Sequence, residues 1–474
     1  MHSAEEKRPR AVLVAVQLPG VDDEQLERDL EELVRLVTTL GLDVVGRVTQ
    51  RRPRLRAGTV LGLGKLRELA RFTGGSGQPG PRIASQERAA ERRGESLGSE
   101  SAEDDDWDEL DDEADDSDGA ADFGGEGRRE RAEVVVVDHE LTPTMQRNLE
   151  RATGAEVLDR SQVIVEIFHR HAKSREARLQ VEIARLNYIA PRLREAGAGA
   201  DRQRGGIGGK GAGESAVELD RRKIRDRIAE LKRELSQIEA QQATRRRARQ
   251  EQRRVALVGY TNAGKSSLMR ALTSSEVYVA DKLFATLDTT VRALRPEVTP
   301  RILVSDTVGF IKKLPHDLVA SFRSTLAEAL EASLLLYLVD ASDPSFPDQL
   351  EVSRQVLADI GAADVPSRLI LNKRDRLTEA RRAELAALYP GALQVSAHDP
   401  NDVRRVREAL IEFFDGELTE GEVFVPYERH GRVAIVYETA TVVAERHDEN
   451  GTHLRVRAPR LAFARLKTDL AAEG

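Results

Sequence analysis

The segment Gly259-Tyr-Thr-Asn-Ala-Gly-Lys-Ser266 limits the fold of this chain more than any other feature. It follows the apolar run Val255–Val258, which is typical of a buried strand, and it precedes apolar residues at helical spacing. In the pattern GxxxxGK[ST] between a strand and a helix, glycines let the backbone wrap phosphate groups, and successive N–H groups point at the negative charge. The segment therefore predicts a phosphate-binding loop, with Lys265 at the β- and γ-phosphates and Ser266 as a ligand of Mg²⁺.

Three more motifs stand at the ends of apolar runs downstream of this loop. Ligands of open α/β sheets bind at the carboxyl ends of strands, so the order and spacing of the motifs count for more than any one of them. Together with the phosphate loop they are typical of an α/β P-loop GTPase domain with a parallel-type sheet. The motifs are Asp306-Thr-Val-Gly309, Asn372-Lys-Arg-Asp375 and Ser396-Ala397.

Each motif supplies a group that a guanine nucleotide needs. Asp306 can hold Mg²⁺ through water, and the Gly309 N–H can sense the γ-phosphate. The Asp375 carboxylate can accept hydrogen bonds from N1–H and the 2-amino group of guanine, whereas adenine offers neither donor. The backbone of Ser396-Ala397 can present an N–H to the guanine O6. The sequence therefore predicts selectivity for GTP over ATP.

The pattern of apolar runs predicts four domains. A small N-terminal α/β domain is expected at residues 1–160, interrupted at about 74–131 by an insertion whose Gly, Ser, Asp and Glu content predicts disorder. An antiparallel helical hairpin is expected at 161–252, the GTPase domain at 253–418, and a small C-terminal α/β domain at 419–474. The apolar runs of the first domain are Ala11–Leu18, Leu42–Val48, Thr59–Leu63 and Glu133–Val137.

A coiled-coil rhythm predicts the hairpin, because apolar residues of its second helix follow spacings of 7, 4, 3, 4 and 3. The Gly-rich tip Asp201–Glu214 suits either a flexible connector or a backbone that approaches another molecule closely. Residues 169–254 carry 23 Lys or Arg against 12 Asp or Glu, which suits either RNA binding or a solvated, salt-bridged face. The seam residues are Val217, Ile224, Ile228, Leu231, Leu235 and Ile238.

Composition excludes several classes of protein. The chain has no cysteine, which excludes disulfides and cysteine-ligated metals. The first ten residues contain no apolar stretch of signal-peptide type, and the longest strongly apolar run, Leu334–Val339, is too short to span a bilayer. The net charge of −8 conceals an acidic segment, because residues 100–126 contain 15 Asp or Glu and no Lys or Arg. The expected location is the cytoplasm.

Several strings along the chain carry a family resemblance. They are Arg56–Lys65, Asp138–Glu150 (DHELTPTMQRNLE), Val157–Arg170 (VLDRSQVIVEIFHR), Phe284–Asp288 (FATLD) and Asp306–Leu326 (DTVGFIKKLPHDLVASFRSTL). In these strings the sequence resembles the HflX family of bacterial GTPases, and the resemblance covers nearly all the chain outside 74–131. The chain departs from the family pattern at Gly209–Ser215 and at Leu287–Val291.

The resemblance implies a ribosome-associated GTPase. Its partner would be the large ribosomal subunit, through rRNA and ribosomal proteins, and its role would be to split or rescue stalled ribosomes under stress. The Gly-rich tip would then approach the peptidyl-transferase region. We expect a monomer that uses GTP as substrate, GDP as product and Mg²⁺ as cofactor.

Position and resemblance together make Thr286 the expected switch threonine that completes the Mg²⁺ shell, with Thr289 and Thr290 as competitors. The expected catalytic residues are Lys265, Thr286 and Gly309, and the expected metal ligands are Ser266, Thr286 and Asp306. The residues expected to contact the nucleotide are Gly259, Tyr260, Thr261, Asn262, Ala263, Gly264, Lys265, Ser266, Ser267, Phe284, Ala285, Thr286, Leu287, Asp288, Asp306, Thr307, Val308, Gly309, Asn372, Lys373, Arg374, Asp375, Ser396 and Ala397.

Phe310 follows the DTVG motif directly, where many GTPases place a glutamine that orients the attacking water. Phenylalanine has no hydrogen-bonding group. Either another group positions the water or hydrolysis waits for a partner, and a phenylalanine that only packs is compatible with both. We therefore expect hydrolysis to be slow unless the ribosome stimulates it.

Other functions can be built on the same GTPase domain. A tRNA-modification or membrane-transport GTPase would call for a catalytic cysteine or a membrane span, and the chain has neither. A regulatory GTPase that acts through a protein partner stays an alternative. The basic hairpin favours the ribosomal interpretation over it.

Overall fold

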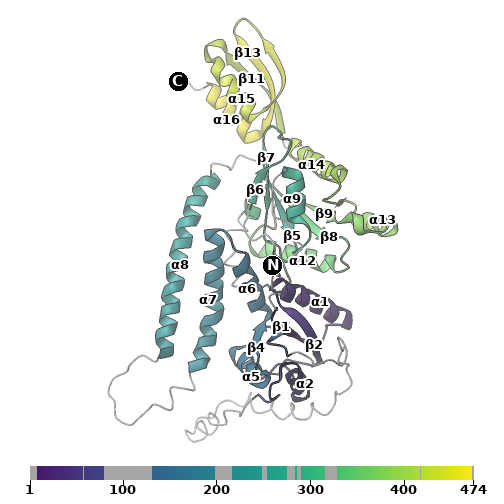
Figure 1. Ribbon diagram of the computed structural model, residues 1–474. Helices are drawn as coiled ribbons and strands as arrows, with labels where there is room; N and C mark the ends of the chain where they lie inside the picture. The colour runs from purple at the N-terminus through teal and green to yellow at the C-terminus, as the bar shows by residue number, and fades with distance from the viewer. Residues whose placement is uncertain are drawn as a thin grey trace, which may run out of the picture. The chain divides into compact units, whose positions relative to one another are not determined.

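The computed structural model describes residues 8–56, 58–79, 131–197, 216–247, 253–274, 283–284, 290–314, 328–416 and 418–471. Figure 1 labels most of their helices and strands. The chain divides into two compact units, Met1–Arg170 with Val181–Leu231, and His171–Gln180 with Lys232–Gly474. This division passes through the two longest helices, α7 (Arg175–Gly197) and α8 (Ala216–Arg247). The units therefore do not follow the four expected domains, whose boundaries stay a prediction.

A parallel sheet of four strands forms the centre of the first unit (Figure 1). Its strand order is β2-β1-β3-β4, and each neighbouring pair is parallel. Parallel sheets are covered on both faces, which explains why β3 is a run of four buried valines. The strands are β1 (Arg10–Gln17), β2 (Asp43–Arg51), β3 (Val134–Val137) and β4 (Glu156–Asp159), and the helices are α1 (Asp23–Thr39), α2 (Leu63–Thr73), α5 (Pro143–Thr153) and α6 (Arg160–His171).

The apolar run Thr59–Leu63 does not form a strand. Val60 has a left-handed backbone with φ of 68°, and its N–H donates to the Arg56 carbonyl at 3.0 Å. The chain reverses there in a tight turn, and α2 begins at Leu63. Val60 and Leu61 are nevertheless fully buried, so their apolar character serves the core without a strand.

The insertion begins later than the sequence suggests. Residues 74–79, which the composition assigns to it, belong to the folded unit. The Gly77 N–H donates to the Ala152 carbonyl of α5 at 2.9 Å, and Gly74 ends α2 in a left-handed conformation. Residues 80–130, with the acidic segment, lie outside the described part of the chain.

The hairpin is formed by α7 (Arg175–Gly197) and α8 (Ala216–Arg247), and its first helix begins at Arg175 rather than 161. Residues from 160 form the separate helix α6, and Ser174 Oγ accepts the Ala177 N–H to start α7. The seam is confirmed for Ile224, Ile228, Leu231, Leu235 and Ile238, the least exposed apolar positions of α8. Val217 and the Gly-rich tip lie outside the residues whose side chains are described.

None of the helices in the described part of the chain has the length and apolar character that crossing a bilayer requires. In α7 and α8 the apolar seam alternates with charged positions. Arg175 of α7, for example, pairs with Glu234 of α8 at 2.9 Å. Because 59 residues of chain separate the two partners, the contact fits an antiparallel pair of helices.

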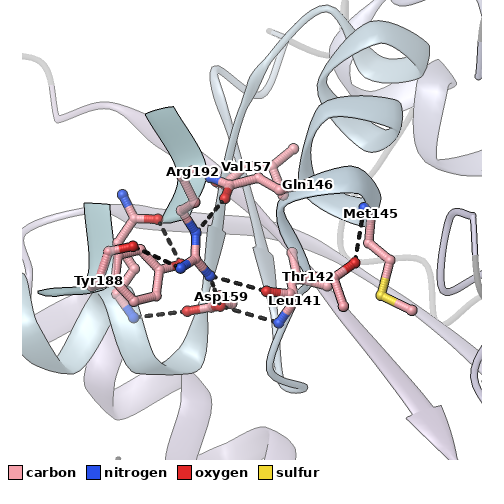
Figure 2. Close-up of polar contacts among 9 residues, drawn as sticks. Leu141, Thr142, Met145, Gln146, Val157, Asp159, Tyr188 and Arg192 are labelled. Carbon is pink, nitrogen blue, oxygen red and sulfur yellow. Dashed lines mark hydrogen bonds and ion pairs between the residues drawn. The ribbon is translucent and has the colours of Figure 1, made fainter. Parts of the chain in front are cut away.

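A buried carboxylate joins α7 to the parallel sheet of the first unit (Figure 2). Asp159, the last residue of β4, is fully buried. Its oxygens accept the N–H groups of Leu141 at 3.1 Å and Gln162 at 2.8 Å. Arg192 of α7 adds an ion pair at 3.1 Å through Nη2. A buried charge is costly unless it is paired and hydrogen-bonded, and here both conditions are met.

Arg192 is held by more than this carboxylate (Figure 2). Its Nε donates to Gln146 Oε1 at 2.9 Å, and its Nη2 donates to the Leu141 carbonyl at 3.0 Å. Its guanidinium lies 3.3 Å from the centre of the Tyr188 ring. Burial raises the pKa of Tyr188 far above its usual range, so the phenol stays neutral beside Asp159. One arginine thus ties α7 to β4 and to the start of α5.

The second unit contains a sheet of six strands in the order β10-β9-β8-β5-β7-β6 (Figure 1). All neighbours are parallel except β6, which runs antiparallel to β7 at the edge. The parallel-type sheet of a P-loop domain is therefore confirmed. Its strands are β5 (Arg253–Gly259), β6 (Thr290–Ala293), β7 (Ile302–Asp306), β8 (Leu334–Asp340), β9 (Ser367–Asn372) and β10 (Leu393–Gln394), and its helices are α9 (Lys265–Thr273), α12 (Phe346–Asp359), α13 (Glu379–Leu388) and α14 (Pro400–Asp415).

An antiparallel sheet with the order β11-β13-β12 forms the C-terminal part of the second unit. Its core combines Val423, Val425, Leu454 and Val456 with apolar residues of the helices. The sequence Glu449-Asn-Gly451 is typical of a turn, and a turn lies there, because Asp448 Oδ1 accepts the N–H groups of Asn450 and Gly451. The elements are β11 (Leu418–Pro426), α15 (Val433–Thr439), β12 (Thr441–His447), β13 (Gly451–Pro459) and α16 (Arg460–Ala471).

The Asp159–Arg192 pair generates a prediction about stability. Arg192→Ala should lower the free energy of unfolding of the first unit by about 3–5 kcal/mol, because it leaves the buried Asp159 carboxylate without its counter-charge. The measurement is a urea titration followed by amide hydrogen exchange at β4 and α5. Arg175→Ala is the matched control, because its pair with Glu234 is largely exposed and should contribute less than about 1 kcal/mol. Equal losses in the two variants would contradict this account.

Candidate functional site

The phosphate loop joins β5 to α9, and two of its glycines are required by close contacts. A Cβ on Gly259 would lie 2.1 Å from the Leu338 carbonyl oxygen of β8. Gly264 has φ of +93°, and a Cβ there would lie 2.2 Å from Asn372 Nδ2. No side chain fits at either position, which explains both glycines of the GxxxxGK pattern. The helix α9 then starts at Lys265, so its first N–H groups open toward the loop.

Lys265 is held at the base of this loop. Its Nζ donates to the carbonyls of Gly259 at 3.0 Å and Tyr260 at 2.8 Å, and the side chain is 6% exposed. Burial lowers the pKa of Lys265 to about 8, and the nearby Asp306 carboxylate opposes that shift. Two fixed carbonyls therefore hold the ammonium where a phosphate group would enter.

Ser266 and Asp306 meet across neighbouring strands. Asp306 ends β7, the partner of β5, and it is fully buried. Ser266 Oγ donates to Asp306 Oδ2 at 2.6 Å. A hydroxyl and a carboxylate are the hard oxygen ligands that Mg²⁺ prefers, and this pair lies beside Lys265. The two residues therefore fit the requirement of a magnesium ion.

The DTVG motif lies directly against the phosphate loop. A Cβ on Gly309 would lie 2.8 Å from Thr261 Cγ2 and 3.1 Å from Lys265 Nζ. Only glycine allows this approach, which explains the last position of the motif. Thr307 serves the sheet instead, because its buried hydroxyl donates to the Leu257 carbonyl at 2.7 Å. The backbone at Gly309 is thus within reach of the group that Lys265 would bind.

Phe310 packs inside the domain and ties two loops together. Its side chain is 3% exposed. Its N–H donates to the Gly259 carbonyl at 3.1 Å, and its carbonyl accepts the Thr261 N–H at 2.8 Å. The Tyr260 hydroxyl extends the contact by accepting the Lys312 N–H at 2.7 Å. In this position the apolar ring offers no hydrogen bond to a water molecule.

Asn372 connects three loops through one side-chain amide. Its Nδ2 donates to the Ala263 carbonyl in the phosphate loop at 2.8 Å. Its Oδ1 accepts the Ala397 N–H after β10 at 3.1 Å. The residue is 2% exposed. The sequence motif assigns Asn372 to the nucleotide, whereas in the structure both ends of the amide bind protein.

Asp375 is the exposed acid of the same motif. It lies in the short 3-10 turn η3 (Arg374–Arg376) that follows Lys373. A hydrogen bond from the Ser396 side chain, with a smaller contribution from His398, lowers the pKa of Asp375 below its usual range. The carboxylate therefore stays ionised at neutral pH, as an acceptor for two donors of a base must.

Sequence reasoning missed one acid that shapes the base-binding end of the site. Asp402, near the start of α14, is 2% exposed and its Oδ2 accepts the Ser396 N–H at 2.9 Å. Its Oδ1 pairs with Arg374 at 3.3 Å and Arg405 at 3.2 Å. The sequence did contain a signal for Asp402, because it is an acid in the first turn of the helix that follows the Ser396-Ala397 motif. Asp402 thus fixes the loop that carries Ser396 and Ala397.

The structure brings most of the expected residues together at the carboxyl ends of β5, β7, β9 and β10. Phe284 is described and is 3% exposed, with φ of 56°. The expected switch residues Ala285, Thr286, Leu287 and Asp288, and the competitor Thr289, lie outside the described residues. Thr290, the other competitor, starts the edge strand β6.

Comparison with known proteins covers nearly the whole chain. A family described as 50S ribosome-binding GTPase matches residues 254–373. The GTP-binding GTPase N-terminal and middle-region families match 27–77 with 124–169, and 171–249. A GTPase HflX from Gluconacetobacter diazotrophicus is 58% identical over 469 residues, or 98% of both chains. The chain belongs to the HflX family of GTPases.

More distant HflX relatives extend the match. The GTPase HflX of Caldanaerobacter subterraneus is 34% identical over 450 residues, which is 94% of this chain and 90% of that one. The GTPase HflX of Escherichia coli is 38% identical over 340 residues, 71% of this chain and 80% of its own. A solved GTP-binding protein from Sulfolobus solfataricus in complex with GDP has a TM-score of 0.41 and 20% identity, over 85% of this chain and 99% of that one, and is too distant to bear on function.

Membership of the HflX family confirms the fold class and the enzyme class expected from the sequence. The chain is a GTP-binding protein that hydrolyses GTP to GDP and phosphate. The strings that carried the resemblance include DHELTPTMQRNLE and VLDRSQ. In the structure these two strings supply Leu141, Gln146 and Asp159, the residues that bind Arg192 in Figure 2. Part of the HflX pattern therefore encodes the attachment of α7.

The exposed carboxylate of Asp375 generates a prediction about base selectivity. Asp375→Asn replaces an acceptor with a donor facing N1–H of guanine. It should cost about 2–3 kcal/mol, or roughly a hundredfold in affinity for GDP measured by calorimetry. Xanthosine diphosphate should bind the variant better than GDP does, because its C2 oxygen accepts from the new amide.

Asp399→Asn is the matched control. Asp399 caps α14 by accepting the Asn401 N–H at 2.9 Å, and asparagine caps a helix equally well. This variant should bind GDP as the natural chain does. Unchanged GDP affinity in Asp375→Asn would remove Asp375 from the base-binding site.

Proposed function

We propose that the chain binds Mg²⁺ and GTP through the residues expected from the sequence. Lys265 and the backbone N–H groups of 262–267 would bind the phosphates, while Asp375, Ser396 and Ala397 would bind guanine. Ser266, Asp306 and Thr286 would hold Mg²⁺, which neutralises charge on the phosphates when it is bound. Support comes from the fixed ammonium of Lys265, the Ser266–Asp306 contact and the ionised Asp375. Thr286 rests on its position and on the family resemblance.

Hydrolysis needs charge stabilisation and an oriented water molecule. Lys265 can stabilise charge on the transferred phosphoryl group, and the Gly309 backbone lies close to the Lys265 ammonium. Phe310 offers no group for the water, because its ring is apolar and buried and its N–H already donates to Gly259. The proposal rests on this contrast. The site has the groups that bind GTP, while Phe310, at the position of the water-orienting glutamine in many GTPases, offers no hydrogen bond.

We further propose that the large ribosomal subunit is the partner that completes hydrolysis. The matched family at 254–373 is described as a 50S ribosome-binding GTPase, and the relatives are named HflX. The helix α8 adds exposed basic side chains that can neutralise RNA phosphates. They are Arg222, Lys223, Arg225, Arg227, Lys232 and Arg233.

The proposed biological role is to split or rescue ribosomes that have stalled under stress. A factor of this kind would act in the cytoplasm as a monomer that binds the subunit with GTP and leaves it with GDP. The apolar seam of α8 can pack against α7, and such packing would give the hairpin the rigidity that a projecting contact needs. Its Gly-rich tip is proposed to approach the peptidyl-transferase region, and that loop lies outside the described residues.

The partner-gated site generates a prediction about hydrolysis rates. The isolated chain should hydrolyse GTP slowly, and purified large ribosomal subunits should raise kcat by about tenfold or more. Groups supplied by partners raise GTPase rates by roughly 10³–10⁵ in other systems, so tenfold is a low threshold. Phosphate release is measured at saturating GTP, with and without subunits.

Small ribosomal subunits at equal concentration are the control for non-specific effects of RNA. A Lys265→Met chain, which loses the phosphate-binding ammonium, controls for GTPases carried by the ribosomes. Fast turnover by the isolated chain with no response to large subunits would contradict the proposal. Equal stimulation by both subunits would contradict the choice of partner.

A further inference from the structure

Asp340 lies at the end of β8, directly beside the NKxD motif, and no sequence motif assigns it a role. It pairs in register with Asn372, the last residue of β9. The two strand ends stay joined, because the Ala341 N–H donates to the Asn372 carbonyl at 3.0 Å. The carboxylate of Asp340 is therefore fixed next to the loop that would bind guanine.

The two oxygens of Asp340 have different partners. Oδ2 accepts Lys373 Nζ at 2.7 Å, an ion pair in which the side chains are 16% and 17% exposed. Oδ1 accepts the N–H of Ser342 at 3.1 Å and its hydroxyl at 2.5 Å. Ser342 thus fixes the orientation of the Asp340 carboxylate, and this carboxylate fixes the position of the Lys373 ammonium. Mostly buried, charge-assisted contacts of this kind fix a side chain far better than exposed ones do.

Lys373 also has an unusual backbone. Its φ of 61° and ψ of 34° are left-handed, a conformation that lysine adopts only under constraint. Its carbonyl accepts the Arg376 N–H at 3.0 Å and so closes the turn that carries Asp375. Asn372 anchors the near side of Lys373 to the phosphate loop. The direction of Asp375 therefore depends on how Lys373 is held.

Charge gives a second reason for the pair. Lys373 is two residues from Asp375, and a free ammonium at that distance could swing onto the Asp375 carboxylate. Such a contact would occupy the oxygens that guanine needs. With Nζ bound to Asp340, the Asp375 carboxylate is instead aimed by the Ser396 hydroxyl.

We propose that Asp340 is a positioning residue for guanine selectivity, which anchors Lys373 so that the left-handed turn holds and Asp375 stays available to the base. The inference rests on the proposed assignment of Asp375 to guanine. Asp340 itself contacts no nucleotide in this account. Its effect passes through Lys373.

The test compares GDP with inosine diphosphate, which lacks the 2-amino group, by calorimetry in the full chain. The natural chain should prefer GDP by roughly tenfold, since one hydrogen bond to a charged group is lost with inosine. Asp340→Ala should weaken GDP binding by about tenfold and remove most of that preference. Without the anchor of Lys373, the Asp375 carboxylate is no longer held in the orientation that accepts from guanine. Asp340→Asn should give an intermediate preference, since its single amide oxygen can replace only one of the two carboxylate oxygens and still accept from either Lys373 or Ser342.

Asp343→Ala is the matched control from the same loop. Asp343 accepts the Ser345 N–H at 2.9 Å and Gln349 Nε2 at 2.9 Å, so its hydrogen bonds organise the start of α12 rather than Lys373. This variant should keep the preference for GDP. The thermal unfolding temperature of each variant shows whether weaker binding comes from a loss of folded structure or from a changed orientation of Asp375.

Two results would overturn the proposal while leaving the base assignment intact. In one, Asp340→Ala keeps the preference for GDP. In the other, it weakens both nucleotides equally, as a purely structural role would. Asp375→Asn is measured in parallel to tell the two levels apart. If that variant also keeps its GDP affinity, the assignment of Asp375 fails, and the role of Asp340 fails with it.

Discussion

The side-chain amide of Asn372 is the contact on which the nucleotide site depends. Ala263 and Ala397, its two partners, belong to loops that are far apart in the sequence and that follow different strands. Each strand end is fixed by the sheet, but the loops beyond the strand ends are joined to one another by this amide. Because it is buried, losing either hydrogen bond would leave a polar backbone group without a partner. Phosphate binding and base binding are therefore mechanically linked.

Close packing in the site explains why two motif positions are glycine. Gly264 leaves room for the Asn372 amide itself, and Gly309 leaves room for Thr261 and Lys265. A side chain at either position would push two loops apart. The backbone pairing of Phe310 with the phosphate loop adds a second connection on the other side of Lys265. Among the described residues of this site, the position where many GTPases place the water-orienting glutamine holds the buried Phe310.

The sequence predicted those features that depend on a few residues of particular chemistry. The glycines that allow close approach, Lys265 and Asp375 stand in short motifs at fixed spacing. This spacing predicted the fold class, and it named the candidate site residues that the structure brings together at the strand ends. Asp340 and Asp402 could not be predicted, because their roles arise from contacts between strand ends that no local pattern records. The apolar run around Val60 did not distinguish a turn from a strand, because both bury apolar side chains equally well. Likewise, the strings around Leu141 and Asp159 identified the family, but only the structure connected them with Arg192.

Asn372 holds together the phosphate loop and the loops after β9 and β10. Amide hydrogen exchange of the natural chain and of Asn372→Ala, each without nucleotide, tests it most directly. Faster exchange is expected in the variant at 260–264, 373–376 and 396–398 together, with a loss of GDP affinity of about a hundredfold for two buried hydrogen bonds. Faster exchange confined to 373–376, with GDP affinity unchanged, would show that the loops are independent and would contradict the account.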